Sequence, residues 1–239
     1  MDGQYHGGAA FVFVNSGVII MAKLEIVTSK RFGQKSVLAN ASLECVSGTI
    51  TGIFGRNGCG KSTLLKIIFG TVRGDAVQIK IDDMRVDPSA IIPKQLIAYL
   101  PQHNFLPKHL KVRDVIPMYY PDGGSQDRIF YADGISKIAN TQTGALSAGE
   151  IRYLQLLMVG NLAHPFVLLD EPFSMVDPLY RERIQAYLLA LKSTKGIIIT
   201  DHYFEDVLGI TDFNFVLKEG QLLPVNGRED LLRLDYLRG

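Results

Sequence analysis

The chain has 239 residues, enough for one domain, or for one domain with a smaller lobe, around a substantial core. Its hydrophobic fraction of 47% and charged fraction of 21% are ordinary for a globular α/β protein and exclude wholesale disorder. The net charge is +1, with acidic and basic residues interspersed, so the chain lacks the overall charge of a nucleic-acid-binding protein and no nucleic-acid partner is expected.

The first 20 residues are expected to lie outside the folded domain. The most apolar stretch there, residues 11–21, is interrupted by Asn15, Ser16 and Gly17, and it falls short of the roughly 20 apolar residues that a membrane-spanning helix requires. Only His6 precedes it as a basic residue, so it also lacks the leader of a secretory signal. We expect a single domain over residues 21–239, preceded by a leader, a poorly ordered extension or a loose strand.

Six apolar runs bounded by turn residues are typical of buried strands, and we expect several of them to be parallel. They cover residues 24–27, 50–54, 97–100, 166–169, 196–200 and 213–217. Helical patterns lie between some of the runs: at residues 62–69, from residue 151 to before Pro165, and at residues 178–191, where Pro178 suits a first helical position. This alternation predicts an α/β fold with a mainly parallel sheet covered on both faces.

The stretch that begins near residue 106 has a different character. Between residues 106 and 143 the periodicity is weaker, and three prolines and an Asp-Gly-Gly turn occur. We expect a small, mainly helical lobe inserted into the sheet domain, reaching about residue 160 when the following helix is included. Leu106, Leu110, Met118, Tyr119 and Tyr120 could either form an apolar docking groove or simply pack this lobe.

A glycine-rich segment between an apolar strand and a helix matches the phosphate-loop pattern G-x-x-x-x-G-K-[ST]. Its residues are Gly55, Arg56, Asn57, Gly58, Cys59, Gly60, Lys61, Ser62 and Thr63. Glycines let successive backbone N–H groups turn toward a phosphate, and the following helix adds the positive end of its dipole. Lys61 would reach the outer phosphates and the Ser62 hydroxyl would bind Mg²⁺. The motif predicts ATP or another nucleotide as ligand, without separating kinases, GTPases and motor ATPases.

Two carboxylates end the apolar run at residues 166–169. Asp170 at the tip of a buried strand beside the phosphate loop is suited to holding Mg²⁺. Glu171 follows it directly and would polarise an attacking water as the general base. A solvated acidic turn is the alternative, and the intact phosphate loop favours the catalytic interpretation.

Further motifs, in the right order, make the chain resemble the ABC (ATP-binding cassette) ATPases. Leu146, Ser147, Ala148, Gly149 and Glu150 resemble the LSGGQ signature of that family. Gln102 looks like its Q-loop glutamine, Asp177 lies in a segment similar to its D-loop, and His202 follows a strand as its switch histidine does. Phe32 precedes the phosphate loop at about the distance of its adenine-stacking aromatic residue. The resemblance extends from about residue 24 to residue 232.

This resemblance implies a fold, a chemistry and a set of partners. The fold would be that of the P-loop NTPases, with a mainly parallel central sheet, a small antiparallel β part and an inserted helical subdomain. Catalysis would involve Glu171, His202 and Lys61, and Mg²⁺ would be held by Ser62, Gln102 and Asp170. Two ATP molecules would be enclosed between the phosphate loops and signatures of two cassettes, so a second ABC ATPase subunit, identical or related, is required.

The signature departs from the family pattern at two positions. Ala148 replaces a glycine and narrows the backbone conformations available there, and Glu150 replaces a glutamine. Ser147 and Glu150 also have the spacing of a helix capping box, which is compatible with a role in gripping a phosphate. Phe32 in place of a tyrosine keeps the aromatic face and loses a hydroxyl.

The resemblance favours the ATP-hydrolysing subunit of a transporter, bound to integral-membrane permease subunits at the cytoplasmic face of a membrane. The two cysteines, Cys45 and Cys59, have no metal or redox spacing, which agrees with a reduced, cytosolic setting. The alternative function is that of a soluble single-cassette ABC ATPase acting in macromolecular or cofactor assembly. A non-hydrolysing regulatory cassette is disfavoured because Glu171 and His202 are present.

Overall fold

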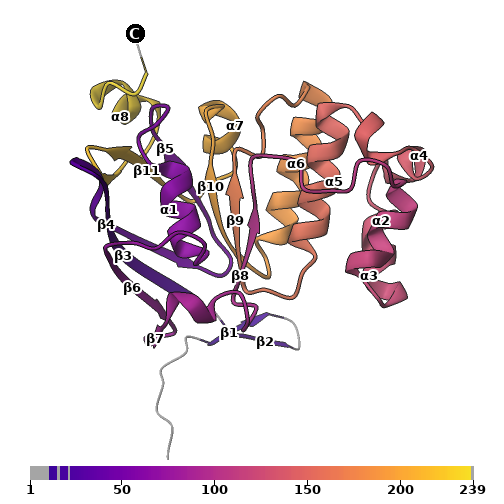
Figure 1. The fold of residues 1–239 in the computed structure, drawn as a ribbon, viewed down its shortest axis with the longest axis horizontal. Helices are drawn as coiled ribbons and strands as arrows, with labels where there is room; N and C mark the ends of the chain where they lie inside the picture. Colours follow the sequence, from indigo (N-terminus) through magenta and orange to yellow (C-terminus); the bar gives the residue numbers. More distant parts are fainter. Residues whose placement is uncertain (1–10, 15–16, 21, 238–239) are drawn as a thin grey trace, which may run out of the picture.

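The computed structural model describes residues 11–14, 17–20 and 22–237, and its centre is a six-stranded sheet (Figure 1). The strand order is β12-β11-β5-β10-β9-β8. The strands are β5 (Ile50–Phe54), β8 (Ile97–Leu100), β9 (Phe166–Asp170), β10 (Gly196–Thr200), β11 (Phe213–Lys218) and β12 (Gln221–Pro224). All neighbouring pairs are parallel except β11 with β12, which confirms the mainly parallel sheet.

The central strands β5, β9 and β10 are buried on both faces, which explains why they are nearly continuous apolar runs rather than alternating ones. On β9, the side chains of Phe166 and Leu168 belong to one hydrophobic cluster, and those of Val167 and Leu169 belong to the other. A strand places successive side chains on opposite faces, so each cluster fills one side of the sheet. The central strands are thereby held rigidly, with their carboxyl ends at a common edge.

A second sheet corrects one prediction. The run at residues 24–27, expected among the buried and largely parallel strands, lies in β3 (Lys23–Phe32), which pairs antiparallel with β4 (Lys35–Val46) and β6 (Ala76–Ile81). The turn between β3 and β4 contains Gly33 at φ 57°, and so short a connection joins antiparallel neighbours. With β7 (Met84–Val86), these strands make the small antiparallel β part, in the order β4-β3-β6-β7.

Helices cover the central sheet on both sides. Helix α1 (Lys61–Ile68) packs between the two sheets, because its buried side chains share a cluster with Leu24 and Ile26 of β3. Helices α5 (Ala148–Gly160) and α6 (Pro178–Leu191) cover the opposite face. The short elements α7 (Phe204–Leu208), α8 (Arg228–Arg233) and η1 (Pro88–Ala90) join or follow the strands.

The stretch after β8 is helical, and Figure 1 shows it at the end of the molecule opposite the antiparallel sheet. It contains α2 (Val112–Tyr119), α3 (Gly123–Phe130), α4 (Ile135–Ile138) and the turn η2 (Thr143–Ala145). Their apolar side chains, such as Val115 and Ile129, join the cluster under α5 and α6. The lobe is therefore packed onto the main domain through α5.

The N-terminal extension is described only in part, since residues 1–10 and 15–16 lie outside the described residues. Strands β1 (Phe11–Val14) and β2 (Gly17–Ile20) form an antiparallel pair, so this part of the expected extension is a small sheet of its own. Within the described parts of the chain, no helix has the length and apolar character needed to cross a bilayer.

Candidate active site

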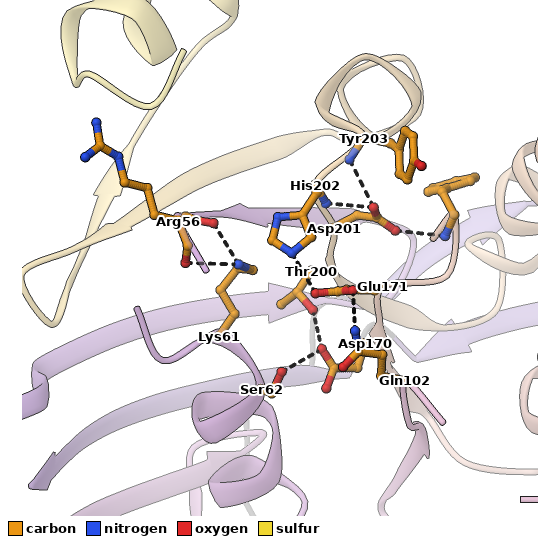
Figure 2. Close-up of polar contacts among 12 residues, drawn as sticks. Arg56, Lys61, Ser62, Gln102, Asp170, Glu171, Thr200, Asp201, His202 and Tyr203 are labelled. Atoms are coloured by element: carbon orange, nitrogen blue, oxygen red, sulfur yellow. Dashed lines mark hydrogen bonds and ion pairs between the residues drawn. The ribbon is translucent and has the colours of Figure 1, made fainter. Parts of the chain in front are cut away.

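The candidate site lies where the carboxyl ends of the parallel strands meet. The phosphate loop follows β5, Gln102 follows β8, Glu171 follows β9 and His202 follows β10. Because β8, β9, β10 and β5 are neighbours in the sheet, these four segments come together at one edge. Figure 2 shows their side chains converging there. Ligands of open α/β sheets bind at this edge, so the topology brings the predicted residues into one place.

The phosphate loop ends in a conformation that requires glycine. Gly60 is the N-cap of α1, with φ 118°, and no side chain caps that helix. A Cβ atom at Gly60 would lie 2.6 Å from Val37 Cγ1 on β4, so a larger residue would clash as well as strain the backbone. The first N–H groups of α1, together with the helix dipole, are thus directed at an anion in the loop.

Lys61 is the cation of this loop. Its side chain is buried, and Nζ donates a hydrogen bond to the carbonyl oxygen of Gly55 at 2.7 Å. Nζ also donates a long bond, at 3.5 Å, to the carbonyl oxygen of Arg56, and an ammonium has three donors, so one donor is left for a phosphate. Lys61 also lines the adjoining cavity, where it would reach the outer phosphates.

A cavity of about 650 Å³ adjoins the loop, a size within the range of small-molecule sites. Its lining combines the phosphate loop, the strand ends and the antiparallel sheet, namely Phe32, Lys35, Val37, Asn57, Gly58, Gly60, Lys61, Ser62, Thr63, Gln102, Glu171 and His202. The Phe32 ring stands at the end of β3 with 54% of its surface exposed, so its face is available for stacking on a base. The cavity therefore fits a nucleotide triphosphate.

Three hydroxyl groups converge on the buried carboxylate of Asp170. Ser62 Oγ lies 3.1 Å and Thr200 Oγ1 2.9 Å from Oδ1, while Tyr99 OH donates to Oδ2 at 3.0 Å. The hydroxyl and carboxylate oxygens of Ser62 and Asp170 are the donors that Mg²⁺ prefers. Across the described residues, no cluster of three or more His, Cys, Asp or Glu side chains is arranged for a metal. Gln102, the third predicted ligand of the ion, donates through its side-chain amide to Glu171 in this structure, and its role toward Mg²⁺ stays a prediction.

Glu171 has both carboxylate oxygens engaged. Gln102 Nε2 donates to Oε2 at 2.6 Å, and His202 Nε2 lies 2.8 Å from Oε1 (Figure 2). The backbone of Glu171 has φ 54°, a left-handed conformation that costs free energy in a residue other than glycine. Its N–H is bonded to the carbonyl of Thr200 at 2.7 Å, which helps to hold that conformation.

Asp201 fixes the loop that carries His202, a role that the sequence did not indicate. The Asp201 carboxylate is buried and accepts hydrogen bonds from the N–H groups of Phe173, His202 and Tyr203, at 2.8, 2.7 and 3.0 Å. Burial raises the pKa of Asp201, and the three N–H groups oppose that rise. The carboxylate thus ties the segment after β10 to the segment after β9.

The signature segment begins α5 and lies outside the cavity of its own chain, as judged from the described residues. Ser147 Oγ accepts from the Glu150 N–H at 3.2 Å, and a Glu150 carboxylate oxygen accepts from the Ser147 N–H at 2.8 Å, which confirms the capping box. A Cβ atom on Gly149 would lie 2.7 Å from Asp177 Oδ2, so the signature and the D-loop are in direct contact. Asp177 itself caps α6.

Two residues of the loop direct their side chains away from the cavity. Arg56 Nη2 donates to the carbonyl of Asp235 at 2.8 Å, and Figure 2 shows the Arg56 side chain extended away from Ser62. Cys59 lines a smaller space of about 250 Å³ behind the loop, together with Arg56 and Tyr236. Arg56 and Cys59 therefore do not line the nucleotide cavity, and the Cys59 N–H donates to the carbonyl of Arg56 at 3.1 Å.

The apolar residues of the lobe divide into two groups. Leu106 and Tyr120 are buried and Leu110 is half-buried, so these three pack the lobe. Met118 and Tyr119 expose 63% and 45% of their surfaces. Packing thus accounts for the first three residues, and docking stays a prediction for Met118 and Tyr119.

The sequence did not predict the side chains that hold the site residues in place. Thr200 and Tyr99 hold Asp170, and their only signal was a hydroxyl residue in an otherwise apolar strand. Arg152 on α5 is buried and donates to the carbonyls of Pro101 and Asp170, and the helical pattern gave no indication of this role. These contacts depend on how the strands and α5 are placed in space.

A family model described as ABC transporter matches residues 38–174 of the chain. A probable ABC transporter ATP-binding protein of Azorhizobium caulinodans is 29% identical over 215 residues, which cover 85% of this chain and 76% of that protein. The lipopolysaccharide export system ATP-binding protein LptB of Haemophilus influenzae is 28% identical over 224 residues, covering 88% and 92%. A solved nucleotide-free ATP-binding cassette from an ABC transporter has a TM-score of 0.75 at 22% identity, covering 90% of this chain and 96% of that one.

The family match spans more than half of the chain and includes the phosphate loop, Gln102, the signature and the acidic end of β9. The structural likeness to solved ATP-binding cassettes confirms the P-loop NTPase fold. ATP hydrolysis is the general activity of the family, and the cavity beside the phosphate loop has the size and lining that a nucleotide needs. The chain therefore belongs to the ABC transporter family and is an ATP-binding ATPase of the ABC type.

Proposed function

We propose that this chain powers the movement of a substrate through a separate transmembrane permease, as a peripheral subunit on the cytoplasmic face of a membrane. The observation that carries the proposal is the pair formed by Gln102 and Glu171 at 2.6 Å. Glu171 borders the nucleotide cavity, while Gln102 begins the segment that leads into the helical lobe. A partner that binds the lobe and moves Gln102 would therefore affect Glu171, the residue to which we assign activation of the attacking water.

The chemistry that we assign to the site is hydrolysis of the terminal phosphate of ATP. Lys61 and the N–H groups at the start of α1 would hold the phosphates, and Phe32 would stack on the adenine. Glu171 would accept a proton from the attacking water, with His202 orienting its carboxylate. Ser62, Asp170 and Gln102 would hold Mg²⁺, which would supply positive charge to the phosphate oxygens.

Completion of the site requires a second cassette. The signature segment of this chain does not line the cavity beside its own phosphate loop, and the capped start of α5 places Ser147 at an exposed position. A helix N-terminus attracts an anion, which supports a role in binding the ATP held by a partner. Closure of two cassettes around ATP and their release after hydrolysis would supply the mechanical step.

The permease is tested by trapping the ATP-bound state. Glu171→Gln should slow hydrolysis and prolong the closed state, because the amide cannot accept the proton from water. The tagged full chain would be captured from native membranes in ATP and Mg²⁺, with Lys61→Ala as the control that cannot grip phosphate. We expect an integral-membrane protein in constant ratio to the Glu171→Gln chain, and much less of it with Lys61→Ala.

The second candidate function is a soluble assembly ATPase, and the same capture separates it from the first. Constant-ratio recovery of a protein without membrane spans, from the soluble fraction alone, would contradict the transporter proposal and favour that alternative. The exposed pair Met118 and Tyr119 supports a docked partner in either case and does not by itself choose between them.

A further inference from the structure

Arg152 is a buried charged residue beside the site for which the proposed chemistry has no use. It lies on α5, five residues after the N-cap Ser147, and only 5% of its surface is exposed. Nη1 donates to the carbonyl oxygen of Pro101 at 2.6 Å, and Nη2 donates to the carbonyl oxygen of Asp170. One planar group thus joins the start of α5 to the ends of two strands, β8 and β9.

The residues that follow these two carbonyls are the pair of the proposed function. Gln102 follows Pro101, and Glu171 follows Asp170, so the guanidinium holds the backbone directly before each of them. The two donors of one guanidinium lie in a rigid fork, which sets the separation of the carbonyls that they bind. The 2.6 Å contact between Gln102 Nε2 and Glu171 Oε2 depends on that separation.

The positive charge of Arg152 is compensated by the carboxylates of the site, none of which forms a direct ion pair with it among the described residues. Burial lowers the pKa of Arg152 to about 10, and the carboxylates of Asp201, Asp170 and Glu171 oppose that decrease. The side chain is therefore still a cation at neutral pH. Among the described residues, its Nε is one of the few buried polar side-chain atoms without a hydrogen-bond partner. Arg152 also lines a space of about 300 Å³ together with Gln102 and Glu171, so the cation lies directly beside the pair.

We propose that Arg152 is a positioning residue for ATP hydrolysis, which holds Gln102 and Glu171 together and fixes their place relative to the signature end of α5. The inference rests on the roles proposed above for Gln102 and Glu171. The consequence is that a displacement of the signature helix is transmitted to the pair through the two carbonyl contacts. The strained backbone of Glu171 makes the pair sensitive to such a displacement, because that conformation persists only under tight restraint.

The test uses the full chain with Arg152→Met and Arg152→Lys, and measures kcat and KM for ATP and the thermal midpoint. Lys195→Met is the matched control, because Lys195 is also a buried cation that donates to two carbonyls, those of Leu162 and His164, each at 2.5 Å. Lys195 precedes β10, so its contacts lie at the other edge of the sheet. Removal of either cation should lower the thermal midpoint similarly.

We expect Arg152→Met to lower kcat by about 10- to 100-fold, because small misplacements of catalytic groups have effects of that order. KM for ATP should stay within about twofold, since Arg152 does not line the nucleotide cavity. Arg152→Lys keeps the positive charge, but an ammonium lacks the two rigidly spaced donors of the guanidinium. This variant should therefore have a thermal midpoint near the wild-type value while its kcat stays low. It also keeps the test decisive if Arg152→Met does not fold. Lys195→Met should keep the wild-type kcat.

A double-mutant cycle with Gln102→Ala identifies the route of the effect. Since Arg152 acts through the pair, Arg152→Met should lower kcat far less in the Gln102→Ala background than in the wild type. Full additivity, or wild-type kcat in Arg152→Lys, would overturn the positioning role. Wild-type hydrolysis by Gln102→Ala would instead contradict the proposed role of the pair itself. Slow hydrolysis by Gln102→Ala together with wild-type hydrolysis by Arg152→Met would refute only the positioning role.

Discussion

At the scale of single residues, the site depends on groups that the motifs do not contain. The phosphate loop and the Asp-Glu pair could be predicted because their chemistry requires fixed residue types at fixed spacing. Tyr99 and Thr200 could not be predicted, since their function is to direct hydroxyls at Asp170 from neighbouring strands. Their contribution follows from strand register, which pairs Thr200 directly with Asp170. The register between two strands depends on both of them, so the sequence of one strand cannot predict it.

Tyr99→Phe tests whether these hydroxyls orient the carboxylate for Mg²⁺. Loss of the bond to Oδ2 frees Asp170 to rotate, so the Mg²⁺ concentration that gives half-maximal hydrolysis should rise by about tenfold, the order reported for groups that orient metal ligands. KM for ATP at saturating Mg²⁺ should stay near the wild-type value. The control is Tyr187→Phe, because Tyr187 is half-buried like Tyr99 and its hydroxyl contacts Asn161 on the α5–α6 side of the molecule. An unchanged Mg²⁺ dependence in Tyr99→Phe would show that its hydroxyl only packs.

At the scale of elements, the contact between α5 and α6 depends on glycine. Gly149 and Gly160 both face α6, where an added Cβ atom would lie 2.7 Å from Asp177 Oδ2 and 2.5 Å from the Tyr187 hydroxyl. The helix pattern predicted α5 and α6, and the strand pattern predicted their sheet. Neither pattern could predict that Gly149 is needed for close helix packing, because the signature motif already accounted for a glycine at that position.

Gly149→Ala should therefore disturb packing as well as the signature. The new methyl group would push Asp177 and the Tyr180 ring away, and we expect a loss of about 1–3 kcal/mol in the free energy of unfolding, the usual range for overpacking. Chemical denaturation of the full chain measures it. Gly124→Ala on α3 is the matched control, because its Cβ atom would meet only Asp122 Oδ1 at 3.6 Å. A Gly149→Ala chain as stable as the wild type would contradict the close packing of the two helices.

At the scale of the whole molecule, the sequence predicted the fold class and the order of the site segments better than it predicted the sheet assignment. The run at residues 24–27 resembled a parallel strand because only its apolar core was considered, whereas β3 continues to Phe32 and turns back through Gly33. The two-sheet arrangement matters for function, since it brings Phe32 to the cavity that also contains Glu171. Such long-range proximity follows from the packing of α1 between the sheets.

The two cysteines report on the integrity of this packing. Burial between β4 and the central sheet raises the pKa of Cys45 to about 12, so it holds almost no reactive thiolate at pH 8. Cys59 is partly exposed and serves as the internal reference. We expect iodoacetamide to modify Cys59 in the native chain, and Cys45 only as global unfolding proceeds, as followed by mass spectrometry of the peptides. Modification of Cys45 at the rate of Cys59 under native conditions would contradict the buried arrangement.

The most direct test of the account concerns Glu171, and it measures steady-state hydrolysis and ATP binding by the same purified full chain. With Glu171→Gln, the rate should fall by at least about 100-fold, as expected for loss of a general base, while ATP still binds because Lys61 and the loop are intact. Glu229→Gln, at an exposed position on α8, should hydrolyse ATP normally. Hydrolysis by Glu171→Gln at a rate close to the wild type would contradict the assignment of this site.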